Sequence, residues 1–200
     1  MGLDGWLVFA AFWVVFVTSP GPNAVNCVGN GMAYGFKRSL WGVAAILVQA
    51  FLFLTLSAAG LAAALAAAPG AIGVLRLVGA MVLVWLGVRT VLRARVAMGA
   101  QAGAGSVFWR AFLIATLNIK SLMGYLAGFT QFVDPAVPVW DQMAVIYPTA
   151  MTLTGLSYCG YTALGAGLGR TAMAAITGVW FRQVMGVAFV IYGVALGLSG

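Results

Sequence analysis

Two short polar segments interrupt apolar stretches of this chain and hold the residue types best suited to bind a small polar molecule. The first has the sequence Thr-Ser-Pro-Gly-Pro-Asn, from Thr18 to Asn23. Pro20 and Pro22 lack a backbone N–H and clash with the preceding turn, so an α-helix cannot pass through them undisturbed. The freed backbone groups need a cavity, a neighbouring helix or water if the helix lies in hydrocarbon. With Gly21 between the prolines, the segment predicts a substrate-binding break rather than a simple kink satisfied by neighbouring hydroxyls.

Lys120 is the charged residue of the second segment, residues 116–121, whose sequence is Thr-Leu-Asn-Ile-Lys-Ser. If its helix begins near residue 111, Lys120 lies ~13 Å inside that helix. A lysine within a membrane span indicates a functional site, and its ammonium group would hold a substrate carboxylate. Asn23 and Asn118, with helix-end carbonyls, would hold the α-ammonium. The alternative is a lysine that extends to the membrane surface or bonds to carbonyls freed by the first break.

Gln49 and Asp134 complete the set of candidate site residues. Gln49 lies in another apolar stretch, where it either lines the substrate path or bridges two helices. Asp134 is the candidate for proton coupling, although a carboxylate at the water edge can also be simply solvated. The other acidic residues are Asp4 and Asp141. Asp4 is the second residue of the first predicted span, and no acidic residue lies deeper in any span. A cationic side chain would therefore lack an ionised partner in the membrane core, which favours a neutral amino acid or derivative.

The composition places these residues in a membrane protein. Of the 200 residues, 64% are hydrophobic and only 6% are charged, whereas a soluble domain carries about 25% charged residues. The net charge of +7 comes from basic residues between apolar stretches, so membrane topology explains it better than nucleic-acid binding. The chain has no His and no Glu, which removes most routes to a metal centre or a catalytic triad. We therefore predict no enzyme, no metal and no cofactor.

Six transmembrane helices account for nearly the whole length, because each needs about 20 apolar residues. We predict an all-α integral membrane fold with spans at residues 3–28, 39–64, 72–92, 111–132, 143–167 and 179–199. The first span lacks a preceding basic region, so it is predicted to be retained rather than cleaved as a signal peptide.

The distribution of charge predicts the orientation of these spans. Lys and Arg fall in alternate connections, which puts both termini outside the cytoplasm. Each half of the chain opens with an interrupted span. Residues 1–200 thus form one membrane domain, predicted to be a 3+3 inverted repeat of residues 1–96 and 106–200.

With these breaks located, the chain resembles the lysine exporter family (LysE/RhtB type), also called homoserine/threonine efflux proteins. The resemblance covers nearly the full length and implies a six-helix exporter of amino acids in the bacterial inner membrane, driven by the proton motive force. The matching segments are residues 18–23 for Thr-Pro-Gly-Pro-Asn, with Ser19 inserted, 77–89 for the third span, 118–120 for Asn-Pro-Lys, and 131–135 for Gln-Phe-Val-Asp-Pro.

Ile119 and Thr130 stand where the family has proline, so the fourth helix is expected to be able to run continuously. Alternatives to active export stay open. They are a passive channel, a non-transporting membrane module, or a transmembrane thiol–disulfide redox protein that uses Cys27 and Cys159. The cysteines fall in the first and fifth spans rather than one in each broken span, which disfavours redox chemistry. The expected partners are an amino-acid substrate and the bilayer, with no nucleic acid; a homo-oligomer is open.

Overall fold

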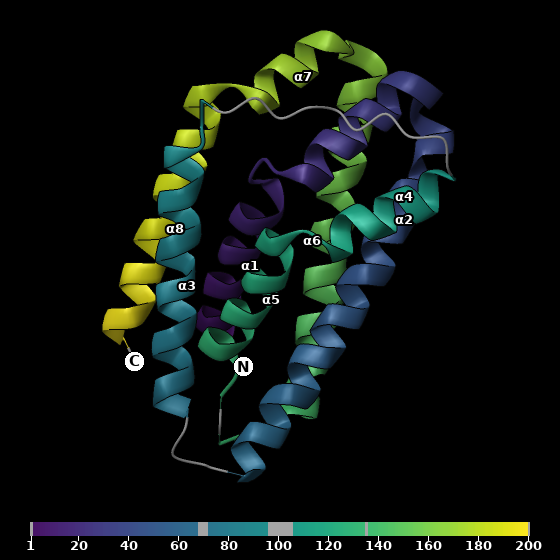
Figure 1. The fold of residues 1–200 in the computed structure, drawn as a ribbon. Coiled ribbons are helices and arrows are strands. Elements are labelled where there is room, and N and C mark those ends of the chain that lie inside the picture. Colours follow the sequence, from purple (N-terminus) through teal and green to yellow (C-terminus); the bar gives the residue numbers. More distant parts are fainter. Residues whose placement is uncertain (1, 68–71, 96–105, 135, 200) are drawn as a thin grey trace.

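A computed structural model describes residues 2–67, 72–95, 106–134 and 136–199, and nearly all of these are helical (Figure 1). No strand occurs within these ranges. The predicted all-α class is therefore confirmed. In chain order the helices are α1 (Leu3–Thr18), α2 (Pro22–Ala67), α3 (Ile72–Leu92), α4 (Val107–Thr116), α5 (Ile119–Phe132), α6 (Val139–Leu168), α7 (Arg170–Thr177) and α8 (Val179–Ser199).

The residues left between the predicted spans 3–28 and 39–64 are helical, apart from a kink within them. Only Gly35 departs from helical geometry, with φ 70° and ψ 174°, a conformation that glycine adopts without steric cost. The chain thus turns at one residue, between the helical segments 22–34 and 36–67. Gly31 lies where α2 and α6 approach closely, because a Cβ there would overlap the backbone of α6. The stretch predicted to connect the last two spans likewise contains a helix, α7.

Length and apolar composition identify fewer spans than the six predicted. Among the described helices, the stretch Pro22–Ala64 passes this test alone. Two bent pairs pass when each is counted as one span: Val107–Thr116 with Lys120–Phe132, and Arg170–Thr177 with Val179–Ala195. The six-span arrangement and the inverted repeat therefore stay predictions, although α3 and α8 coincide with the third and sixth predicted spans.

The first helix lies at the centre of the molecule. In Figure 1, α1 and α5 lie between α3 with α8 on one side and α2 with α6 on the other. Phe9, Phe12, Trp13 and Phe16 of α1 are buried in the main apolar cluster. The Trp13 indole N–H donates to the Ala150 carbonyl of α6 at 3.1 Å. The most extensive helix contacts are α2 with α6 and α3 with α8, so the central helices are held between two tightly packed pairs.

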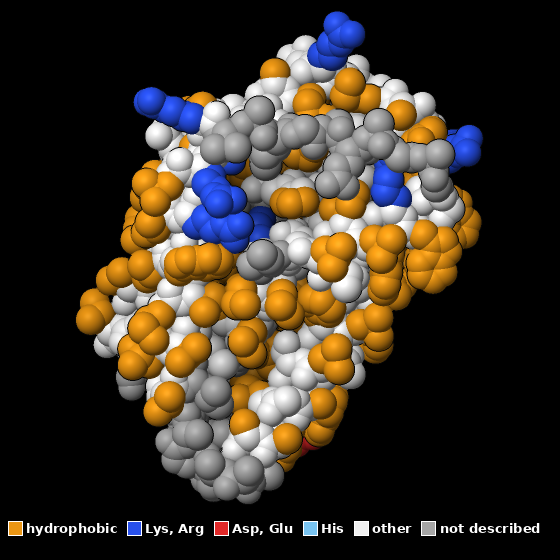
Figure 2. Space-filling model, in the orientation of Figure 1, with side chains coloured by type: hydrophobic (Ala, Val, Ile, Leu, Met, Phe, Trp, Pro, Cys, Tyr) orange, Lys and Arg blue, Asp and Glu red, His pale blue; other side chains and the backbone are white. Residues whose placement is uncertain are grey.

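Charged side chains gather at one end of the molecule. Figure 2 shows Lys and Arg in the upper part of the view, the part that includes α7, with apolar side chains over much of the surface below. We call this the basic end. Both termini lie in the lower half of the view (Figure 1). Since basic residues favour the cytoplasmic side, the basic end is predicted to face the cytoplasm.

Close packing of α2 on α6 generates a stability prediction. A Cβ added to Gly165 would overlap the backbone of Val28 in α2, whereas one added to Gly160 of the same helix meets nothing within 4 Å. We expect Gly165→Ala to lower the free energy of unfolding by about 1–3 kcal/mol through overpacking. Gly160→Ala is the matched control and should be neutral or slightly stabilising. Thermal unfolding in detergent measures both, and equal stability of the two variants would contradict the close contact.

Candidate substrate site

The predicted break in the first span is present between α1 and α2. Helix α1 ends at Thr18, and Ser19 caps it in an extended conformation (φ −65°, ψ 128°) with its N–H on the Val15 carbonyl. Pro22 is the first residue of α2. At that position the missing N–H of proline costs no helical hydrogen bond, and its fixed φ suits a helix start. The two prolines therefore end one helix and begin the next.

Three consecutive carbonyls at the end of α1 accept hydrogen bonds from side chains of other helices. The Ser157 hydroxyl of α6 donates to the Val17 carbonyl at 3.2 Å. The Tyr161 hydroxyl, one turn further along α6, donates to the Thr18 carbonyl. Lys120 Nζ of α5 donates to the Ser19 carbonyl at 2.6 Å. We call these three the freed carbonyls.

The second break lies between α4 and α5, where the two helices are bent by 58°. The expectation that Ile119 permits a continuous helix is therefore wrong. Asn118 supplies the physical reason: its backbone is extended (φ −76°, ψ 103°) and its side chain accepts the Lys120 N–H as an N-cap of α5. Asparagine is among the best N-capping residues. It can thus interrupt the span without a proline.

The two breaks meet. Besides the contact between Lys120 and the Ser19 carbonyl, the Asn118 amide Nδ2 donates to Asn23 Oδ1 at 3.4 Å. Lys120 Nζ also lies 5.5 Å from the centre of the Phe16 ring and 5.9 Å from that of Phe189. Lys120 was expected either to hold a substrate, to extend to the membrane surface or to bond to a freed carbonyl. The structure shows the last of these contacts. The two asparagines predicted to hold an α-ammonium contact each other.

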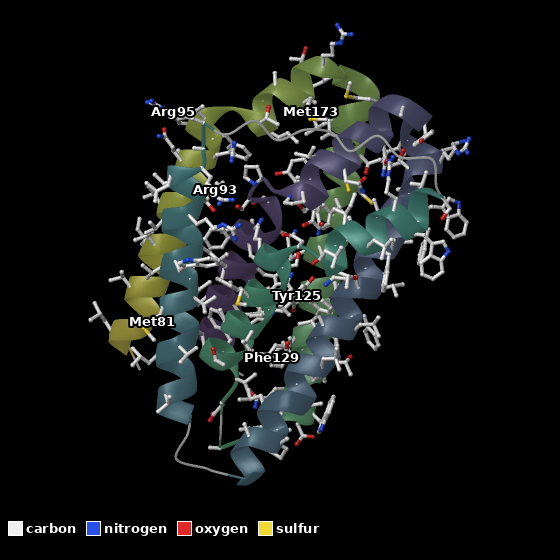
Figure 3. The ribbon with its side chains drawn as sticks, viewed as in Figure 1. Met81, Arg93, Arg95, Tyr125, Phe129 and Met173 are labelled. Carbon is white, nitrogen blue, oxygen red and sulfur yellow. The ribbon has the colours of Figure 1, made fainter. Side chains whose placement is uncertain are left out.

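A pocket of about 350 Å³ opens where the breaks meet. We call it the basic pocket. It includes five of the predicted site residues, and its described lining is Pro20, Gly21, Pro22, Leu86, Arg89, Thr90, Arg93, Leu117, Asn118, Lys120 and Arg182. Four of these residues are cationic and none is acidic. Arg93 lies in the upper part of the molecule, toward the basic end (Figure 3). The pocket therefore suits a ligand that carries negative charge.

The three arginines of this pocket were missed as site residues, because their place near loops explained them through topology. Arg182 is only 6% exposed and donates to the carbonyls of Arg93 and Ala94 after the end of α3. The Arg89 guanidinium lies 5.1 Å from the Trp85 ring. Arg89 and Arg93 are four residues apart, which puts them on one helix face. That spacing was the available signal.

The remaining predicted residues lie outside the basic pocket. The Thr18 hydroxyl bonds within its own helix, to the Val14 carbonyl at 2.6 Å. Gln49 is fully buried in α2, and neither of its amide atoms has a hydrogen-bond partner among the described residues. Asp134 is exposed beyond the far end of α5, where Oδ1 accepts the Ala136 N–H. By helix rise it lies roughly 20 Å from Lys120.

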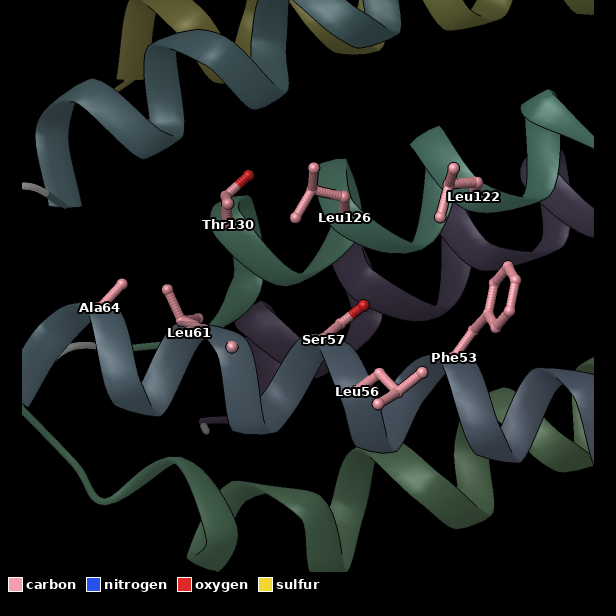
Figure 4. A pocket seen from close by; sticks show the side chains of 9 residues that line it. Phe53, Leu56, Ser57, Leu61, Ala64, Leu122, Leu126 and Thr130 are labelled. Atoms are coloured by element: carbon pink, nitrogen blue, oxygen red, sulfur yellow. The ribbon is translucent and has the colours of Figure 1, made fainter.

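A second cavity, of about 390 Å³, has a largely apolar lining without charged residues (Figure 4). It lies between α2 and α5, and its described lining is Phe53, Leu56, Ser57, Gly60, Leu61, Ala64, Leu122, Leu126 and Thr130. Such a lining offers nothing to neutralise the charges of a zwitterion, so the basic pocket remains the candidate substrate site.

Cys27 and Cys159 are both free thiols. Cys27 is buried in an apolar cluster of α2, α4, α6 and α7 residues, and Cys159 packs against the same cluster. In this state they contribute as small apolar side chains.

Comparison with known proteins assigns the chain to a protein family. Residues 14–200 match the family described as LysE type translocator. An uncharacterized membrane protein of Vibrio cholerae serotype O1 is 33% identical over 175 residues, 85% of each chain. A leucine efflux protein of Enterobacter sp. is 26% identical over 80% of this chain and 77% of the relative. One of Klebsiella pneumoniae subsp. pneumoniae is 25% identical over 79% and 76%. No solved structure matches this chain.

The hydrogen bond from Tyr161 to the Thr18 carbonyl can be tested by removing one oxygen. We expect Tyr161→Phe to lower the free energy of unfolding by about 1–3 kcal/mol, because the variant leaves a part-buried carbonyl without its partner. Tyr34→Phe is the matched control, since the Tyr34 side chain is exposed on α2. Thermal unfolding in detergent compares them. If the Tyr161→Phe variant were as stable as the control, the hydrogen bond to the Thr18 carbonyl would not stabilise the break.

Proposed function

This chain belongs to the family of LysE type translocators, and we propose that it exports a neutral amino acid or a close derivative from the basic pocket. It is a multi-pass protein of the bacterial inner membrane. LysE type translocators and the relatives named leucine efflux proteins are transporters rather than enzymes, and they support amino-acid export as the general activity. The name leucine efflux protein, carried by two of the relatives above, makes leucine the first cargo to test.

The contact between Lys120 and Ser19 is the observation that carries the proposal. An ammonium group has three N–H donors, and here one of them is given to the neutral Ser19 carbonyl. The positive charge is thus oriented without being neutralised by a carboxylate. A substrate carboxylate that enters the basic pocket can take the remaining donors in charge-assisted hydrogen bonds, which are about twice as strong as neutral ones.

The α-ammonium of the substrate needs acceptors on the other side of the same site. A carbonyl oxygen has two lone pairs, so the Ser19 carbonyl can accept from Lys120 and from a substrate at once. Asn118 lines the pocket as well, and its amide oxygen is a further acceptor. No acidic side chain is among the described lining residues to hold a cationic substrate. These features favour an uncharged substrate side chain.

A dicarboxylic amino acid is the second candidate, because Arg89 and Arg93 add positive charge to the same pocket. A growth-toxicity screen separates the two. Overexpression of the protein should relieve the toxicity of leucine or another neutral amino acid or analogue if the first proposal holds. Relief confined to aspartate or glutamate analogues would select the second.

Removal of the Lys120 charge tests the site. We expect Lys120→Met to lower export of the cargo by about 10–150-fold, because a hydrogen bond to a charged group contributes about 1.5–3 kcal/mol. Lys37→Met is the control, since Lys37 is exposed beside the Gly35 turn. Efflux of labelled leucine from preloaded cells is measured at equal amounts of folded protein. Undiminished efflux by the Lys120 variant would refute the assigned role.

We also propose that the proton motive force drives export, with Asp134 as the proton carrier. Collapse of the proton gradient by an uncoupler should then stop accumulation against a gradient, whereas a passive channel would continue to equilibrate leucine. Asp134→Asn should lose uphill export but keep downhill exchange. Asp141→Asn, a change of another exposed carboxylate in the first turn of α6, is the matched control. Uphill export by the Asp134 variant would exclude that residue from coupling.

A further inference from the structure

A row of asparagines follows one face of the first segment of α2. Asn23, Asn26 and Asn30 are spaced by three and four residues, which places them one above another on a helix. Their exposed fractions are 3%, 8% and 1%. The row begins at the helix break and ends near the Gly35 turn. Buried asparagines are uncommon in an apolar interior, because an amide without partners is costly to bury.

Helix α4 lies along this row. At one end, Asn118 donates to Asn23, and at the other, the Arg110 guanidinium donates to the Asn30 amide oxygen. The two contacts fix α4 antiparallel to the segment 22–34, with Asn26 between them. The part of α2 after Gly35 closes the third side, because a Cβ on Gly42 would lie 3.0 Å from Asn30 Nδ2 and 3.3 Å from Val107 of α4.

Several polar atoms in this region have no hydrogen-bond partner in the part of the chain that the structure describes. They are Nδ2 of Asn26, Nδ2 of Asn30, both amide atoms of Gln49 and the hydroxyl of Thr116 in α4. Gln49 lies seven residues after Gly42, two turns along the same face of α2. Each buried polar group without a partner lowers the stability of the folded protein. A purely structural interface would gain stability from apolar side chains here.

We infer that these polar groups, the polar row, line the substrate path between the helix breaks and the basic end, closed in this structure. The inference rests on the proposed export function. Amides both donate and accept, so the row matches the carboxylate and the ammonium of a zwitterion without a fixed charge that would trap it. Arg110 at the outer end presents a cation to the carboxylate. The ligand class is the amino-acid backbone, whatever its side chain.

The breaks provide the joint that opening needs. Helix α4 is joined to α5 by Leu117 and Asn118, at the 58° bend, and its main packing partner is α2 rather than α5. Movement of α4 about this bend would expose the polar row. By contrast, the segment 22–34 is held on α6 by the close approach of Gly31 and Gly165. We therefore assign the movement to α4.

Thiol labelling tests whether the polar row is reached by water. In a background with Cys27→Ser and Cys159→Ser, Asn26→Cys is compared with Val25→Cys, a buried apolar neighbour on the same helix. The probe is a charged, membrane-impermeant methanethiosulfonate applied to inside-out and right-side-out vesicles. We expect Asn26→Cys to react about tenfold faster than Val25→Cys, a ratio that corresponds to ~1.4 kcal/mol, and leucine to slow it. Equal reactivity of the two, or no effect of leucine, would overturn the inference.

Transport by a second variant pair separates this inference from the proposed function. Asn26→Leu keeps the number and branching of the side-chain heavy atoms and removes the amide, and should lower leucine export by about tenfold or more for the loss of one buried hydrogen-bonding group. Val25→Leu is the control and should export like the parent. If Lys120→Met loses export while Asn26→Leu does not, the proposed function survives and the polar row is only a helix contact. If the parent exports nothing, both fail.

Discussion

Backbone groups that lose their helical partners inside an apolar protein must find others, and this constraint organises the molecule around the end of α1. Side chains from α5 and α6 converge on the carbonyls of Val17, Thr18 and Ser19. A side chain can reach these carbonyls only if its helix lies at the right height and rotation. The hydrogen bonds at the break therefore help to position α5 and α6 against α1. The central helix is fixed by polar contacts at its broken end and by the aromatic cluster along its length.

The same constraint places a charge where a transporter needs one. Lys120 donates to a backbone carbonyl, so a structural contact holds it inside the protein, at the wall of a pocket. Arg182 combines two such roles, since it satisfies carbonyls at the end of α3 and lines the same pocket. In the proposed site, the same side chains therefore hold the fold together and bind the substrate.

Much of this arrangement could be predicted from single residues, and the exceptions have physical causes. Pro20 and Pro22 are unambiguous, because proline cannot continue a helix. Asn118 was harder to interpret, since asparagine breaks a helix only when its side chain caps the next one, and the absent proline at Ile119 argued the other way. Gly35 was hidden among other glycines, which alone do not reveal which one adopts a positive φ. The three arginines of the basic pocket could be assigned to one site only once the structure showed which helix ends converge.

The hydrogen bond between Lys120 and the Ser19 carbonyl has a consequence for affinity. A substrate carboxylate can take only the N–H donors that the Ser19 carbonyl leaves, so it gains less than a fully open ammonium group would offer. The hydrogen bond between Lys120 and the Ser19 carbonyl therefore lowers the affinity of the site for a substrate carboxylate. A transporter must release its substrate on the other side of the membrane. A moderate affinity, with the lysine held in place by the protein after release, therefore favours rapid turnover.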